Sequence, residues 1–299
     1  MLPLLHAGGV SMRKLYPYLL LIPTFVIIIM FIYYPAGSAL KLSLYKTSPF
    51  GNRTIYVGLR NFRQLFEDPE YLYAVRFTLI YVSVSVAITI FMSFIIAYML
   101  TRGVPGTRIY RTFLFAPYAV SPAIAGTLWT FLLNPVVGHV NYFFAKLFGI
   151  QVAWLTSKPY AFYALIFATV WKMLPFDMIF YIASIQDVSL DIIEASTLDG
   201  ANTMTRVWRI IFPLVSPITF YLVIMNIVTT MFSSFAIVDV MTSGGPGGYT
   251  TNMIYKLYLD AFTFQKRGPA AAESMIMFAI MLVVTIIYFS FAERKVHYQ

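Results

Sequence analysis

Six long apolar runs divide the chain, separated by shorter segments that hold most of the charged residues. Each run is long enough for a helix that crosses a hydrocarbon core roughly 30 Å thick. A helix is favoured there because it satisfies its own backbone hydrogen bonds. The pattern therefore predicts an all-α integral membrane protein with six transmembrane helices. The runs cover residues 15–36, 75–100, 109–133, 160–184, 212–237 and 270–292.

The composition supports the same class. Hydrophobic residues make up 60% of the 299 residues and charged residues only 11%, which is too few to cover a soluble surface. A net charge of +9 could attract nucleic acid in a soluble protein, but here Lys and Arg are spread over loops and helix ends. We therefore expect contact with membrane lipid and none with nucleic acid.

Metal and enzyme chemistry are not expected. The chain has no cysteine, and its three histidines, His6, His139 and His297, lie far apart in the sequence. A membrane-embedded enzyme needs a dense group of catalytic carboxylates, histidines or serines, and the apolar runs contain none. No catalytic and no metal site is predicted.

The orientation rests on the positive residues nearest to the membrane ends. The first run follows Arg13 and Lys14, as a signal peptide would, but it exceeds the usual core of roughly 7 to 15 residues, which favours an uncleaved span. In a six-span arrangement the positive residues close to the ends of the runs gather on one face. That face is predicted to be cytoplasmic and to carry both termini. The residues are Arg13, Lys14, Arg102, Arg108, Arg111, Arg206, Arg209, Arg294 and Lys295.

No internal repeat or low-complexity linker divides the chain, so residues 1–299 are predicted to form a single transmembrane domain. The longest outer segment, 37–74, contains turn signals on either side of a short amphipathic stretch. We expect a short helix there at the outer interface, with Tyr71 and Tyr73 as aromatic anchors.

A polar insert of about residues 187–213 separates the fourth and fifth runs. Ser189 is a suitable N-cap, Asp191 and Glu194 suit the first turns of a helix, and Gly200 permits a sharp bend that ends it. A second short helix is expected to follow, with Pro213 at the start of the next span. The residues alone leave open an amphipathic loop that lies on the lipid surface.

The insert resembles the EAA motif of permease subunits in ATP-binding-cassette importers. That motif is Glu-Ala-Ala, three residues, Gly, nine residues, then Ile-x-Leu-Pro. Glu194, Ala195, Gly200, Ile210 and Pro213 keep its spacing, while Ser196 replaces the second alanine and Phe212 the leucine. The resemblance implies a cytoplasmic coupling helix that docks on an ATPase subunit. The residues it assigns to this contact are Glu194, Ala195, Ser196, Asp199, Gly200, Ala201, Ile210 and Pro213.

The same resemblance implies that other chains supply the energy. A Walker A loop needs Gly-x-x-x-x-Gly-Lys-Ser/Thr, and this chain has no Gly-Lys pair. The glycine-rich stretch 244–248 lacks the lysine and is interpreted as a tight turn. We therefore expect no cofactor in this chain, with ATP and Mg bound by a dimer of partner ATPases.

Resemblance extends over nearly the whole chain from Tyr16, to the sugar and glycerol-phosphate branch of these permeases. Matching stretches are 58–62, 117–122, 129–141 and 242–251, whereas Phe77 stands where the family often has Asn. The segments 251–256 and 293–299 are most similar to permeases of glycerol-3-phosphate importers. The branch implies a second permease subunit, an extracytoplasmic solute-binding protein and a bacterial cytoplasmic membrane. Glycerol-3-phosphate or a glycerophosphodiester is the expected substrate, and a disaccharide or oligosaccharide remains the alternative.

Polar residues within the apolar runs are candidates for the substrate pathway. Lys172 lies near the middle of the fourth run, where a cation costs on the order of a few kcal/mol unless it is paired or wetted. It could attract a phosphate ester, pair with Asp177 or with a carboxylate of a partner, or cap carbonyls near Pro175. The full set of pathway candidates is Trp171, Lys172, Asp177, Asn226, Ser233, Ser234 and Asp239.

Other interpretations stay open for these polar residues and for two prolines of the third run. Pro117 and Pro122 free backbone carbonyls in the third run, either as a simple kink or as a bend beside a cavity. Polar residues of the fifth run could bind helices together instead of contacting substrate. An ion-coupled carrier is the distant alternative, because it predicts paired intramembrane carboxylates, and only Asp177 and Glu273 come close.

Overall fold

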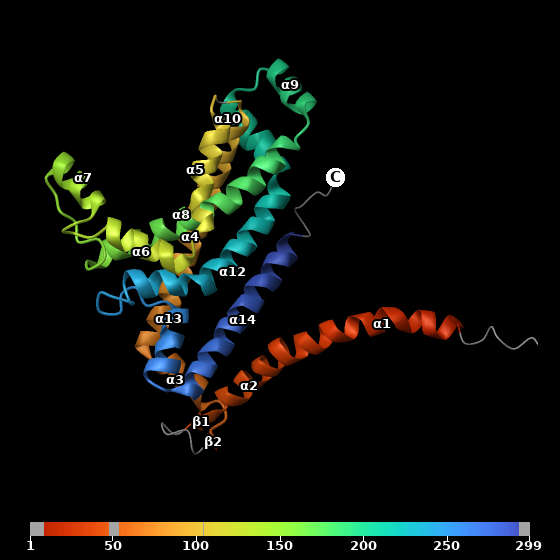
Figure 1. Ribbon diagram of the computed structural model, residues 1–299, viewed down its shortest axis with the longest axis vertical. Coiled ribbons are helices and arrows are strands. Elements are labelled where there is room, and N and C mark those ends of the chain that lie inside the picture. The colour runs from red at the N-terminus through yellow and green to blue at the C-terminus, as the bar shows by residue number, and fades with distance from the viewer. Residues whose placement is uncertain (1–8, 48–53, 104, 293–299) are drawn as a thin grey trace, which may run out of the picture. The chain divides into compact units, whose positions relative to one another are not determined.

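The computed structural model describes residues 9–47, 54–103 and 105–292, and most of these residues are helical (Figure 1). Two compact units make up the fold, residues 1–65 with 260–276 and residues 66–259 with 277–299. The single transmembrane domain over 1–299 stays a prediction. In chain order the elements are α1 (Gly9–Ile28), the π-helix η1 (Ile29–Tyr33), α2 (Tyr34–Ser43), β1 (Tyr45–Thr47), β2 (Thr54–Tyr56), α3 (Arg60–Glu67), α4 (Pro69–Thr101), α5 (Thr107–Ala119), α6 (Pro122–Leu132), α7 (His139–Phe148), α8 (Lys158–Gln186), α9 (Leu190–Leu198), α10 (Thr203–Thr205), the π-helix η2 (Arg206–Ile211), α11 (Phe212–Leu214), α12 (Ser216–Met241), α13 (Met253–Tyr258), the π-helix η3 (Leu259–Thr263) and α14 (Arg267–Ala292).

Five helices among the described residues are long and apolar enough to cross a membrane. They overlap the first, second, fourth, fifth and sixth predicted runs, which confirms the all-α membrane class. They are Tyr18–Ser43, Pro69–Thr101, Lys158–Gln186, Ser216–Met241 and Arg267–Ser290.

The third predicted span, 109–133, is not one helix. It forms α5 and α6, which are interrupted between Ala119 and Pro122. Proline has no amide N–H and disfavours a helical conformation in the residue before it. Ser121 is accordingly extended, with φ −67° and ψ 156°, and its hydroxyl caps α6 by accepting a hydrogen bond from the amide of Ile124. The prediction of six continuous spanning helices is therefore not confirmed.

The unit 1–65 with 260–276 contains the first span and a small two-stranded sheet. The strands β1 and β2 are antiparallel, with Tyr45 paired to Tyr56, and the rings of this pair meet edge to face. Asn61 of α3 is buried and donates to the carbonyls of Ser43 (2.7 Å) and Tyr45 (3.1 Å). Position 268 of α14 must be glycine because it lies against the same strand: a Cβ there would lie 2.3 Å from the carbonyl oxygen of Tyr45.

The predicted short helix of the outer segment is confirmed as α3, but the segment is shorter than expected. The first span continues to Ser43, and α4 already begins at Pro69. Tyr71 is fully buried and therefore is not an interface anchor, which corrects the prediction. The hydroxyl of Tyr73 donates to the carbonyl of Tyr249 (2.8 Å).

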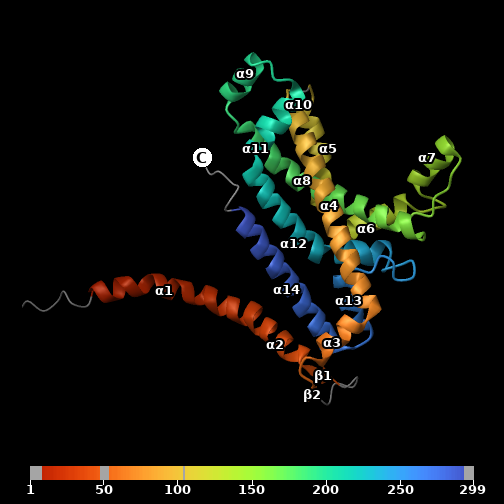
Figure 2. The ribbon, with the colours of Figure 1, turned by 180° about the vertical axis from the view of Figure 1, so that it is seen from behind.

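The unit 66–259 with 277–299 is built on α4, α8 and α12, which pack against one another (Figures 1 and 2). One buried cluster holds Phe77, Tyr81 and Leu165, so Phe77 has an aromatic packing role where the family often has Asn. A second cluster lies towards the end of the unit that carries α9 and holds Phe94 and Tyr181. Both views place α9, α10 and the connection between α4 and α5 at this same end.

Several residues on which the sequence predictions rest lie outside the described parts of the chain. They are His6 and the C-terminal sequence 293–299, which includes Arg294, Lys295 and His297.

Gly126 of α6 provides a test of the packing between α6 and α12. A Cβ on Gly126 would lie 3.2 Å from Cβ of Val240, which is tighter than ordinary contact. We expect Gly126→Val to destabilise the protein by about 1–3 kcal/mol through overpacking. The measurement is thermal unfolding of the purified protein in detergent. Ala123→Val, on an exposed position of the same helix, is the matched control, and equal unfolding temperatures for the two variants would contradict the prediction.

Candidate functional site

The insert between α8 and α12 forms a helix as predicted, and this helix is exposed. The hydroxyl of Ser189 accepts from the amide of Asp191 (3.3 Å) and caps α9, which confirms the expected N-cap. Glu194 and Ala195 are exposed, whereas Ser196 is buried and its hydroxyl donates to the carbonyl of Ile193 (2.7 Å). Position 196 is thus covered while its neighbours Ala195 and Thr197 face outwards.

Gly200 ends α9 in the predicted way. Its φ is +76°, in the left-handed region that favours glycine, and the turn is closed by a hydrogen bond from the amide of Ala201 to the carbonyl of Ser196 (3.0 Å). Asp199, the C-cap, is exposed. A Cβ on Gly200 would meet nothing within 4 Å. The requirement for glycine here therefore comes from the backbone conformation and not from lack of space.

The second half of the insert is also helical. The side chain of Asn202 accepts from the amide of Thr205 (2.8 Å) and caps α10, which continues into η2 and α11. Ala201 and Ile210 are half-buried and Pro213 is exposed. Pro213 lies in the short α11, so the prediction that it begins the next span is corrected: a break at Val215 precedes α12, which starts at Ser216.

Aromatic rings attach this second half to the helices of the bundle. Trp208 stacks on Phe91 of α4 (ring centroids 6.1 Å) and contacts Phe94 of the same helix (5.7 Å). Phe94 also meets Phe212 (5.2 Å) and, across the bundle, Tyr181 of α8 (5.5 Å). The insert thus combines an exposed helix, α9, with a segment that is packed firmly against α4 and α8.

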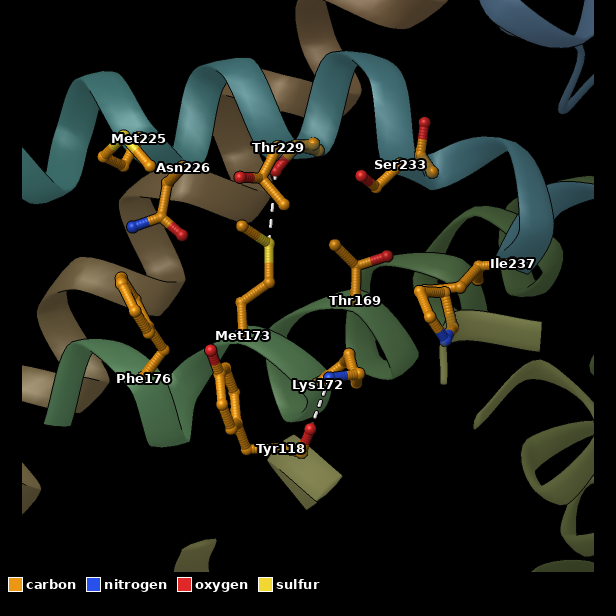
Figure 3. A pocket seen from close by; sticks show the side chains of 13 residues that line it. Tyr118, Thr169, Lys172, Met173, Phe176, Met225, Asn226, Thr229, Ser233 and Ile237 are labelled. Carbon is orange, nitrogen blue, oxygen red and sulfur yellow. Dashed lines mark hydrogen bonds between the residues drawn. The ribbon is translucent and has the colours of Figure 1, made fainter. Parts of the chain in front are cut away.

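A cavity of about 280 Å³ lies between α5, α8 and α12 (Figure 3). Four of the predicted pathway residues line it, namely Lys172, Asn226, Ser233 and Ser234. The other lining residues are Tyr118, Pro122, Thr169, Met173, Phe176, Met225, Thr229, Thr230 and Ile237. Hydroxyl groups, one cation and aromatic rings therefore surround the space.

Lys172 is held at the break between α5 and α6. In a continuous helix the carbonyl of Tyr118 would accept from the amide of residue 122, but Pro122 has no N–H. Nζ of Lys172 donates to this carbonyl at 3.2 Å and also lies 5.0 Å from the centre of the Tyr118 ring (Figure 3). Lys172 thus binds a backbone carbonyl, but that of Tyr118 and not one near Pro175 as suggested from the sequence, and no ion pair with Asp177 forms within the described residues.

The remaining polar candidates mainly link helices. Asp177 is fully buried, and its Oδ2 accepts from Nδ2 of Asn226 (2.7 Å), which joins α8 to α12. Ser234 lines the cavity but accepts from Nδ2 of Asn252 (2.9 Å). Trp171 packs edge to face on Trp129 (5.6 Å), and Asp239 is half-buried near the end of α12. Trp171, Asp177 and Asp239 do not line the cavity.

Sequence reasoning missed several lining residues, above all Tyr118, Thr169 and Thr230. Thr169 lies three residues before Lys172, and Thr230 lies four after Asn226, so helical spacing from the chosen residues would have found both. Tyr118 lies four residues before Pro122 and could have been found from the missing amide.

An exposed helix at one end of a helical membrane bundle, together with a cavity lined by apolar, hydroxyl and cationic side chains, is the arrangement expected of a subunit of a membrane transporter. The family model described as "Binding-protein-dependent transport system inner membrane component" matches residues 89–297. The chain belongs to this family. It is therefore a multi-pass permease subunit.

Curated relatives match nearly the whole chain. It is 38% identical over 283 residues to the "sn-glycerol-3-phosphate transport system permease protein UgpA" of Yersinia enterocolitica, covering 95% of this chain and 96% of that protein. The protein of the same name from Escherichia coli strain UTI89 is 37% identical over 287 residues. A solved bacterial alginate ABC transporter, in complex with an alginate pentasaccharide-bound periplasmic protein, has a chain of the same fold, with a TM-score of 0.83, 21% identity and coverage of 97% and 98%.

Proposed function

We propose that this chain is one of two permease subunits of an importer for glycerol-3-phosphate or a related glycerophosphodiester. The observation that carries the proposal is the 38% identity, over 95% of the chain, to a permease named for sn-glycerol-3-phosphate transport. Such a chain supplies half of a pathway, and a second, similar permease supplies the other half. A solute-binding protein delivers the substrate from outside the cytoplasmic membrane.

The ATPase partner docks on α9. Three large apolar side chains of the insert, Leu190, Leu198 and Met204, are exposed by 72%, 89% and 67%. Apolar groups outside the membrane favour a protein cover. Glu194 adds a charge on the same exposed helix. This end of the bundle is then cytoplasmic, both termini lie on that side, and ATP with Mg is bound by the ATPase dimer.

The aromatic contacts of Trp208 and Phe212 explain how docking could move the pathway. A packed cluster has low compressibility, so a displacement of α9 is passed to α4 and α8 instead of being absorbed. The same α8 carries Lys172 and Phe176 into the cavity. Closure of two ATPases on ATP would then bring the coupling helices together and switch the cavity from one side of the membrane to the other.

The cavity suits a small polar anion. Lys172 supplies a positive charge, and hydroxyls such as that of Thr229 can bond to glycerol oxygens. A disaccharide is the second candidate, because rings and hydroxyls also suit sugars and the solved structure with the same fold is described with an alginate pentasaccharide. A transport assay therefore has to decide between a glycerol phosphate and a disaccharide.

The proposed function is tested by reconstitution. The chain is purified with its second permease and ATPase, placed in proteoliposomes and supplied with the binding protein. We expect ATP-dependent uptake of labelled sn-glycerol-3-phosphate and none of maltose. Uptake of the disaccharide alone would replace the substrate class, and uptake that needs an ion gradient but no ATP would remove the function altogether.

Replacement of Gly200 tests the role of α9. Gly200→Val places a β-branched residue at a φ of +76°, which costs about 1–3 kcal/mol and distorts the turn. We expect ATP hydrolysis to lose its stimulation by the loaded binding protein, with the complex still in the membrane. Gly200→Asn is the control, since Asn tolerates this conformation. Full coupling in the valine variant would argue against a coupling role.

Replacement of Lys172 tests the anion preference of the cavity. We expect Lys172→Gln to raise the KM for glycerol-3-phosphate uptake roughly tenfold, because a charge-assisted hydrogen bond is lost. Lys172→Arg keeps the charge and should retain most of the uptake. Lys158→Gln, on an exposed position at the start of the same helix, is the control. An unchanged KM in Lys172→Gln would show that the lysine serves only to cap the Tyr118 carbonyl.

A further inference from the structure

A second polar site lies along the seam between α5 and α8, towards the end that carries α9. Two openings of about 480 and 420 Å³ meet there and share three lining residues, Arg111, Thr112 and Gln186. Neither opening is lined by an Asp or Glu among the described residues. The local charge is therefore positive.

Arg111 has spare capacity to bind an anion. Its Nε is buried without a hydrogen-bond partner among the described residues. The residue as a whole is only half-buried and lines both openings, so the rest of the guanidinium is accessible from them. A guanidinium presents its donors in a planar fork that matches a phosphate or carboxylate.

This site is in register with the cavity that contains Lys172. On α8 the residues that line one or other space recur every three or four positions, at 172, 176, 179, 183 and 186. On α5 the matching residues are Arg111, Phe115 and Tyr118. This spacing places each set on a single helical face. These two faces together form one track of side chains along α5 and α8.

The track is polar at both ends and apolar between them. Lys172 and Gln186 are 14 residues apart, which is about 21 Å along the helix. Between them lie three rings in contact, with Tyr118 at 5.2 Å from Phe115 and 5.8 Å from Phe176 (ring centroids). A positively charged group thus stands on either side of an aromatic segment.

We propose that Arg111 and Gln186 form an inner anion site, which holds a phosphate monoester after it leaves the Lys172 cavity. The proposal rests on the proposed function for its substrate, but the phosphate chemistry is independent of it. The same group could bind the phosphate of an anionic lipid. The register with the Lys172 cavity favours the transported solute, because a lipid site needs no such alignment.

The binding test uses a cysteine probe, which is unique in this chain because the chain has none of its own. Ala183→Cys places a thiol on the exposed lining of the site. The full transporter is embedded in discs of phosphatidylcholine, and labelling of this chain by a negatively charged methanethiosulfonate is followed by mass spectrometry. We expect inorganic phosphate and glycerol-3-phosphate to slow labelling, and Arg111→Gln to abolish that protection.

Two controls separate the sources of the anion. Arg102→Gln removes an exposed cation at the same end of the bundle that lines neither opening, and it should keep the protection. Discs that contain phosphatidylglycerol test the lipid. Protection that arises only in those discs, without added phosphate, would overturn the solute site in favour of a lipid headgroup. Protection that is absent, or that survives Arg111→Gln, would overturn an Arg111 site of either kind.

Transport completes the test. We expect Arg111→Gln to lower glycerol-3-phosphate uptake about tenfold, Arg111→Lys to recover part of it, and Arg102→Gln to leave it unchanged. Normal uptake by Arg111→Gln would show that the site is not on the route. If the unmodified transporter protects the cysteine but imports no glycerol-3-phosphate, the proposed function fails while the anion site stands.

Discussion

A backbone carbonyl inside a membrane needs a hydrogen-bond donor, and Pro122 removes the one that the Tyr118 carbonyl would have used. The consequences shape the centre of the protein. The third apolar run breaks into α5 and α6, and Lys172 of α8 supplies the missing donor. A lysine that would be costly in hydrocarbon is thereby fixed at the wall of a cavity. The break in the helix, the position of the Lys172 ammonium and one wall of the cavity thus meet at the Tyr118 carbonyl.

The polar groups inside the bundle fall into two kinds. Some already form hydrogen bonds between elements: Asn226 donates to Asp177, Asn252 donates to Ser234, and the hydroxyls of Tyr81 and Thr169 bind each other. These bonds hold α4, α8, α12 and the segment before α13 in one arrangement. Ser233 instead faces open space, and the ammonium of Lys172, which has three donors, lines the same space while one of them binds the Tyr118 carbonyl. The distinction matters for transport, because a group that already binds a neighbouring helix is a poor ligand for a passing solute.

The two halves of the insert at the end of the bundle differ in their surroundings: the first half is exposed and the second is packed against the bundle. The first half ends at a glycine that the backbone requires and leaves its apolar side chains uncovered. The second half is tied to α4 by the rings of Trp208 and Phe212, and Phe94 of α4 in turn meets Tyr181 of α8. The surface proposed to bind the ATPase and a packed cluster that reaches the cavity helix are thus joined within about two dozen residues.

Local sequence patterns were enough to predict many of the helices and the turn of the insert. The apolar runs, the cap at Ser189, the bend at Gly200 and the short helix α3 follow from interactions within a few residues, so the sequence alone determined them. Packing between the helices decided which face of each helix is covered and which lines the cavity. Trp171, Lys172 and Asp177 are neighbours on one helix, yet only Lys172 faces the cavity, and its partner Tyr118 lies 54 positions earlier in the chain. Which side of a helix is covered depends on elements distant in sequence, and only the tertiary structure specifies them.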